Sequence, residues 1–272
     1  MVFSRFFYVL LKVNTYLCGI IFAVCALNNE LLIMNYSELN FDGMTREREL
    51  SMSAAFPVLM RKVYVWMTLA LVLTGVTAYG VATSPGIMTA LFTNRVLFWG
   101  LVIAEFALVI GITAAINKLS LTTATLMFVL YSVINGAVLS SIFIIYTLTS
   151  IASVFFITAG TFAVMALIGY TTKTDLTSMG KILFMALIGI IIATIVNIFL
   201  KSSGLEMIVS YLGVLIFVGL TAYDSQKIKN MLLMAPDAGE GAQKLALLGA
   251  LTLYLDFINL FIYLLRIFGR RE

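Results

Sequence analysis

Seven long apolar segments follow one another along this chain of 272 residues. Each has about 17 to 25 residues, which is the length an α-helix needs to cross the hydrocarbon core of a bilayer. The segments cover residues 63–82, 96–116, 121–141, 150–170, 182–200, 207–227 and 245–266. The sequence therefore predicts an all-α, polytopic membrane protein that forms one helical bundle.

Composition supports this class and excludes several others. Hydrophobic residues make up 62% of the chain and charged residues 11%, whereas soluble domains average about 25% charged residues. The net charge of +4 is modest and the basic residues lie between apolar segments, so we expect no nucleic-acid partner. The chain has no histidine, which excludes HExxH zinc sites, Ser-His-Asp triads and histidine pH switches. A response to pH near neutrality must then come from a carboxylate in an unusual environment.

Basic residues predict the orientation of the bundle. With the segment before the first span in the cytoplasm, ten Lys and Arg residues lie inside and two, Arg95 and Lys201, lie outside. Three further arginines, Arg266, Arg270 and Arg271, would lie outside after a seventh crossing. Either the last segment is re-entrant or it crosses fully against this bias, and we favour a full crossing.

The chain divides into three parts. Residues 63–270 form the seven-helix membrane domain, and residues 44–62 form a cytoplasmic segment before it. Residues 1–43 are an extension whose stretch 6–27 is apolar and contains both cysteines, Cys18 and Cys25. This extension is either an extra membrane helix or a dispensable segment that precedes the functional start. Two cysteines so close together do not indicate a disulfide framework.

Asp256 lies inside the last apolar segment. A charge buried at such a depth costs a few kcal/mol on insertion scales, so a functional site is the default interpretation. Asn259, Tyr263 and Arg266 follow at steps that place them on the same helix face. We interpret Asn259 and Tyr263 mainly as interhelical hydrogen-bonding groups, and Asp256 as functional.

Two more acids lie in apolar segments. Glu105 is in the middle of the second span, and Asp224 lies near the cytoplasmic end of the sixth. If Asp224 faces Asp256, the two carboxyl groups hold one proton between them, because both cannot readily ionise in a low dielectric. Protonated, they form a neutral clasp between helices; ionised, they repel and offer the oxygen ligands that calcium prefers. They meet only if the last helix is tilted or projects into the cytoplasm, because Asp256 lies twelve residues beyond Lys244.

Small residues recur in the third span at Ser132, Gly136 and Ser140, with Asn135 beside them. A row of small residues four apart allows two membrane helices to approach closely. We therefore expect the third span to pack tightly inside the bundle.

The segment 253–269, with LYLDFINLFIYLLRIFG, resembles the signature of the Bax inhibitor-1, or transmembrane Bax-inhibitor-motif, family. Residues 223–228, YDSQKI, resemble its companion motif, and residues 61–79 resemble the opening of its first helix. The resemblance implies a seven-helix fold with the last helix surrounded by the other six. It also implies that Asp224 and Asp256 form a pH-sensing pair and that calcium leaks down its gradient through the bundle.

The same resemblance suggests further roles. Glu105 occupies a region where an acid is linked to the pore, and Lys118 is the nearest candidate for the basic residue that pairs with the aspartates in some members. Bacterial members are inner-membrane proteins associated with the membrane protease FtsH, as substrates or modulators.

These observations predict a pH-regulated calcium-leak channel and not an enzyme. Calcium is the transported ion, bound transiently by Asp224 and Asp256, with Glu105 and Asn259 on its path and Lys118 as a candidate basic partner. We expect no tightly bound cofactor; the partners are the lipid bilayer, calcium and FtsH. Two alternatives stay open. One is a non-conducting regulator or substrate of an FtsH-type protease that uses residues 34–60 as its handle. The other is a proton-coupled transporter.

Overall fold

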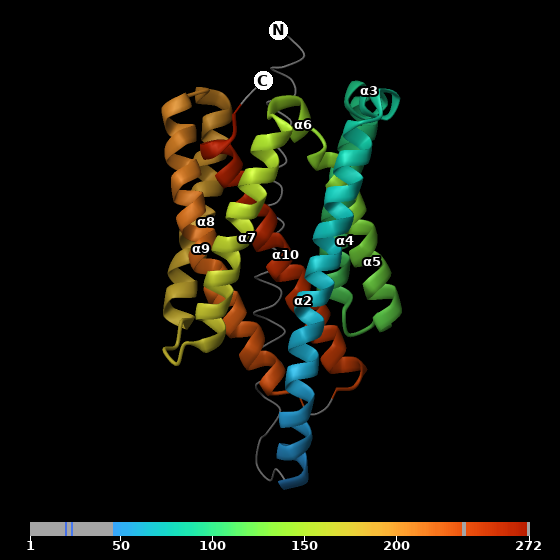
Figure 1. Ribbon diagram of the computed structural model, residues 1–272, viewed down its shortest axis with the longest axis vertical. Coiled ribbons are helices and arrows are strands. Elements are labelled where there is room, and N and C mark those ends of the chain that lie inside the picture. The colour runs from blue at the N-terminus through green and yellow to red at the C-terminus, as the bar shows by residue number, and fades with distance from the viewer. Residues whose placement is uncertain (1–19, 21–22, 24–45, 236–237, 271–272) are drawn as a thin grey trace.

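The computed structural model describes residues 20, 23, 46–235 and 238–270, and the elements in it are helices. Seven of these helices are long and apolar enough to cross a membrane, as the sequence predicts. They are α2 (Arg46–Ala82), α4 (Arg95–Ala115), α5 (Leu121–Leu139), α7 (Leu148–Thr171), α8 (Thr177–Leu200), α9 (Ser203–Leu233) and α10 (Glu240–Phe268). Two short helices, α3 (Pro85–Thr93) and α6 (Ile142–Ile145), lie in the connections at one end of the bundle (Figure 1).

Helix starts are set by polar side chains that the apolar pattern does not reveal. The Asn94 side chain accepts hydrogen bonds from two backbone N–H groups at the start of α4, and Ser120 does the same for one at the start of α5. Thr147 and Ser202 cap α7 and α9 in the same way. Each such cap contributes about 1 kcal/mol to a helix. The boundary between the third and fourth spans, which carries no charge, is thus made by α6 and the Thr147 cap.

The first long helix extends well beyond its apolar segment. α2 has 37 residues, or about 55 Å of helix, and it runs without a break through Pro57. Residues 46–62 therefore continue into the same helix as the first span, and the chain has no structural boundary at residue 62. In Figure 1 the first turns of α2 project below the other helices, whereas Leu59 and Met60 already pack in the core.

The last helix is the centre of the bundle. Every side chain from Leu245 to Leu265 in α10 is buried, which agrees with the family resemblance. α10 packs against α2, α5, α7 and α9, while α4 packs on α5 and α8 packs on α9. Four helices therefore form the inner contact shell, and α4 and α8 lie outside it (Figure 1). The last helix is central, as the resemblance implies, but it packs mainly against four helices and not against all six.

The chain crosses fully in its seventh span. α10 is one continuous helix of 29 residues, and the backbone N–H of Thr147 donates to the carbonyl oxygen of Arg270 at 3.2 Å. The Arg270 N–H in turn donates to the Ser150 hydroxyl at 3.1 Å. The end of α10 therefore lies beside the connection between α6 and α7, and a re-entrant last segment is excluded. The alternatives for residues 1–43 fall outside the described residues, apart from Ile20 and Ala23.

Candidate functional site

Asp224 and Asp256 lie next to each other inside the bundle. Asp256 is fully buried in the middle of α10, and Asp224, in α9, is 3% exposed. The two carboxyl groups lie close enough to interact through their charges, and among the described residues neither oxygen of Asp256 has a hydrogen-bond donor at standard distance and angle. Because an ionised carboxylate can only accept hydrogen bonds, a direct hydrogen bond between the two groups would require a proton on one of them. The structure thus brings together the two acids on which the predicted clasp depends.

The tilt of α10 makes this contact possible. α9 continues past its lysines to Leu233, and α10 begins at Glu240 and crosses the bundle obliquely (Figure 1). If both helices stood upright, Asp256 would lie deeper in the membrane than Asp224. The tilt of α10 brings the two carboxyl groups to the same depth.

A second set of polar contacts joins three helices next to Asp224. The Ser225 hydroxyl donates to the Ala166 carbonyl oxygen of α7 at 2.8 Å. The phenol of Tyr64, from α2, lies beside the Ser225 hydroxyl and interacts with it. The side chain of the residue after Asp224 is thus held between α2 and α7.

The C-terminal end of α9 is anchored to the neighbouring connection between α7 and α8. The Gln226 side chain accepts from the Leu176 N–H and donates to the Thr174 carbonyl, both at 2.8 Å. The Lys229 ammonium donates to the Tyr170 carbonyl at 2.7 Å and lies 5.4 Å from the centre of its ring. These contacts hold the segment of α9 that carries Asp224 against the end of α7.

Glu105 forms a separate buried site. It is fully buried in α4, and its carboxylate lies beside the Asn135 side chain of α5, which interacts with it. The contact is a poor hydrogen bond, since within the described part of the chain neither carboxylate oxygen has a donor at standard distance and angle.

Asn135 continues this site into the centre of the bundle. The Tyr254 phenol of α10 donates to the Asn135 Oδ1 at 3.2 Å and lies 2.7 Å from the Thr74 hydroxyl of α2. A polar chain therefore runs from α4 through α5 and α10 to α2. Sequence reasoning did not identify Tyr254 or Thr74, although Tyr254 lies two residues before Asp256 in the same segment.

The other predicted site residues have different surroundings. Asn259 is buried one turn beyond Asp256, and its amide donates to the Leu255 carbonyl of its own helix at 2.8 Å. Tyr263 stacks on Phe217 of α9, with ring centres 5.8 Å apart. Lys118 is exposed after α4 and makes no ion pair with either aspartate in the described part of the chain. The structure therefore does not bring the candidate basic partner to the aspartate pair.

The residues available for a metal ion are few. Across the described ranges, no group of three or more Cys, Asp or Glu side chains is placed to hold a metal. A calcium ion at Asp224 and Asp256 would therefore need water or backbone carbonyl oxygens to complete the six to eight ligands it prefers. Such a site suits transient binding better than permanent binding.

Comparisons with known proteins agree with this architecture. Residues 57–272 match the family model described as inhibitor of apoptosis-promoting Bax1. The chain is 55% identical over 221 residues to the inner membrane protein YbhL of Escherichia coli K12, covering 80% of this chain and 94% of that protein. A protein of Borreliella burgdorferi is 50% identical over 213 residues, covering 78% and 92%. The protein RP147 of Rickettsia prowazekii is 45% identical over 215 residues, covering 78% and 89%.

Proposed function

We propose that this chain, which belongs to the Bax inhibitor family, lets calcium leak down its gradient under the control of the aspartate pair. It is a multi-pass protein of the bacterial inner membrane, as its seven spans and its similarity to YbhL indicate. The observation that carries the proposal is the contact between the Asp256 and Asp224 carboxyl groups inside the bundle.

The pair acts as a clasp between α9 and α10. With one shared proton, the hydrogen bond holds the two helices together and the path is closed. When the proton leaves, two negative charges face each other in a low dielectric, where repulsion is far stronger than in water. The helices then separate, and the free carboxylate oxygens become ligands for a divalent cation. Leak therefore rises with pH.

Other buried polar groups extend the path across the membrane. Asn259 lies one turn beyond Asp256, toward the C-terminal end of α10. Glu105 adds a further buried carboxylate in α4. Buried acids of this kind typically mark ion paths in membrane proteins.

The test is a calcium flux assay in proteoliposomes at several external and internal pH values. The wild type should leak more calcium as pH rises, and Asp256→Asn should give a low leak that does not depend on pH. Asp175→Asn is the matched control. Its carboxylate is exposed between α7 and α8, where the hydroxyl and backbone N–H of Thr177 hold the pKa of Asp175 below its usual range. An unaltered pH response in Asp256→Asn would overturn the proposal.

A second candidate function rests on the projecting part of α2. Residues 46–54 lie before the first membrane-spanning stretch, which begins at Ala55, and this end of α2 extends beyond the bundle (Figure 1). A free helical projection is a suitable handle for a membrane protease of the FtsH type. Deleting residues 34–53 should then abolish co-purification with the protease and leave calcium flux intact. This deletion spares Leu59 and Met60, which pack in the core.

A further inference from the structure

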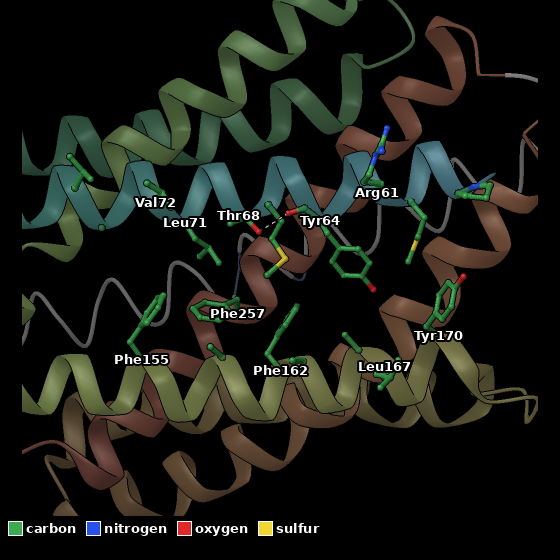
Figure 2. A pocket seen from close by; sticks show the side chains of 18 residues that line it. Arg61, Tyr64, Thr68, Leu71, Val72, Phe155, Phe162, Leu167, Tyr170 and Phe257 are labelled. Atoms are coloured by element: carbon green, nitrogen blue, oxygen red, sulfur yellow. Dashed lines mark hydrogen bonds between the residues drawn. The ribbon is translucent and has the colours of Figure 1, made fainter. Parts of the chain in front are cut away.

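The inner shell of helices around α10 is open on one side. α2 packs on α5 and α10, and α7 packs on α9 and α10, but the described residues make few direct contacts between α2 and α7. A cavity of about 940 Å³ lies between these two helices. Figure 2 shows its two walls, with Leu71 and Val72 of α2 facing Phe155 and Phe162 of α7 and with Phe257 of α10 at its base.

This groove runs along most of the membrane thickness. A second cavity of about 220 Å³ continues it and shares Leu71, Gly75, Phe155 and Phe257 with the first. Together the cavities extend along α2 from Pro57 to Ala78, which is about 32 Å of helix. The hydrocarbon core of a bilayer is about 30 Å thick. The groove is therefore as long as one membrane-spanning helix.

The groove walls have the surface that a packed helix needs. Ala159, Ala163 and Ala166 follow one another along the α7 wall, and Gly75 lies opposite on α2 with open space where a side chain would be. Small residues let membrane helices approach closely. Polar groups are concentrated at the cytoplasmic end, where Arg61 lines the groove, so the remainder suits an apolar occupant.

The chain itself carries such an occupant outside the seven spans. Residues 6–27 form a predominantly apolar stretch of 22 residues, enough to cross the membrane once, with Lys12 and Asn14 in its first half. Within it, Ile20 and Ala23 are helical and half-buried, and Ala23 packs against the same core cluster that contains Phe162 and Phe257. The 18 residues 28–45 then connect this stretch to the start of α2.

We propose that residues 6–27 cross the membrane as an additional helix that fills the groove between α2 and α7 and completes the shell around α10. The segment runs antiparallel to α2, because the 18 residues that link them carry Glu30, Glu38 and Asp42 and therefore stay outside the hydrocarbon. It covers the side of the bundle next to Phe257, the neighbour of Asp256. This assignment holds whether or not the protein conducts calcium.

The cysteine content of the chain allows a direct test. Its two cysteines, Cys18 and Cys25, both lie in residues 6–27. A single new cysteine elsewhere therefore reports contact with this segment alone. Ala163→Cys places a thiol in the groove, and Ala107→Cys places one on the outer face of α4, where Ala107 is also exposed. Both positions lie eight residues before the end of their helix, so they are matched in depth.

The experiment uses full-length protein in membranes, with a protease site inserted between Asn40 and Phe41. After oxidation with copper phenanthroline and cleavage, Ala163→Cys should stay at its uncleaved size on a non-reducing gel and separate into two fragments after reduction. Ala107→Cys should separate in both conditions. Replacing Cys18 and Cys25 by Ser should abolish the cross-link in Ala163→Cys.

A second pair of variants guards against poor thiol geometry. Gly75→Cys lies in the α2 wall, and Gly100→Cys lies on exposed α4; both glycines have open space at the Cβ position. The proposal predicts a cross-link for at least one groove variant and for neither α4 variant. It is overturned if both groove variants separate into fragments, if the α4 variants cross-link as strongly, or if the product has twice the mass of the chain.

Discussion

The phenol oxygen of Tyr254 lies 2.7 Å from the hydroxyl oxygen of Thr74, and this contact joins the central helix α10 to α2. Tyr254 precedes Asp256 by two residues, so at 100° per residue the two side chains point to opposite sides of α10. Tyr254 therefore faces α2 and α5, while Asp256 faces α9. One turn of the central helix thus carries a structural hydrogen bond on one side and the candidate switch on the other.

The Tyr254 hydroxyl should contribute measurably to stability. Tyr254→Phe removes its hydrogen bonds to Thr74 and Asn135 and leaves a buried amide oxygen with one donor fewer. Loss of such a group costs about 1 to 3 kcal/mol. Thermal unfolding in detergent should show a lower Tm for Tyr254→Phe. Tyr211→Phe is the control, because Tyr211 is 53% exposed and should leave Tm unchanged. Equal Tm values for the two variants would contradict the polar chain described above.

Because α5 packs closely on α2, we expect substitutions of glycine at their contact to lower the stability of the protein. A Cβ atom at Gly136 would lie 2.5 Å from the Thr74 carbonyl oxygen, whereas one at Gly160 meets nothing within 4 Å. Gly136→Ala must therefore push two backbones apart and lower the free energy of unfolding. Gly160→Ala should stabilise the protein, by up to about 1 kcal/mol, because alanine favours a helix more than glycine does. Opposite shifts in Tm are expected, and a destabilising Gly160→Ala paired with a neutral Gly136→Ala would show that the helices are not this close.

The aspartate pair should behave as a unit. If one proton is shared, Asp224→Asn and Asp256→Asn each remove the pH dependence of calcium leak, and the double variant adds nothing further. Residues that act through one contact are non-additive in this way. The measurement is initial calcium flux at three pH values for the wild type, both single variants and the double variant. A full pH response in either single variant would show that the remaining acid works alone.

The membrane spans were predictable because apolar length is a local signal. All seven predicted segments correspond to helices, but α2 and α9 extend past their apolar stretches to Arg46 and Leu233. Those ends carry charged residues such as Arg48 and Lys229, so apolar length alone does not reveal that the helices continue there. The sixth span was therefore predicted to end at residue 227, six residues too early.

The candidate site was only partly predictable for a different reason. The cost of burying a carboxylate points to Asp256 and Glu105 from sequence alone. The meeting of Asp224 with Asp256, which the family resemblance implies, depends on the tilt of α10, and no local sequence pattern encodes that tilt. Thr74 and Tyr254 are 180 residues apart. The Thr74 hydroxyl also donates to the Ala70 carbonyl oxygen of its own helix, as Thr side chains in helices commonly do. A buried Tyr254 phenol needs a partner, but the sequence does not say which one.

A substitution of Glu105 should test calcium conduction separately from its control by pH. Its carboxylate is fully buried in α4 and lies beside Asn135, away from the aspartate pair between α9 and α10. Glu105→Gln removes a hard oxygen ligand from the proposed path, so calcium leak should fall severalfold at every pH. The relative increase of leak with pH should persist, because Asp224 and Asp256 are intact.

Stability distinguishes this effect from a damaged fold. A neutral glutamine avoids the cost of a buried charge and can still bond to the Asn135 amide, so Glu105→Gln should unfold at the same or a higher temperature. Glu105→Asp keeps the carboxylate and should retain more flux than Glu105→Gln. Full flux in Glu105→Gln would remove Glu105 from the ion path, and loss of the pH response in that variant would place Glu105 in the switch itself.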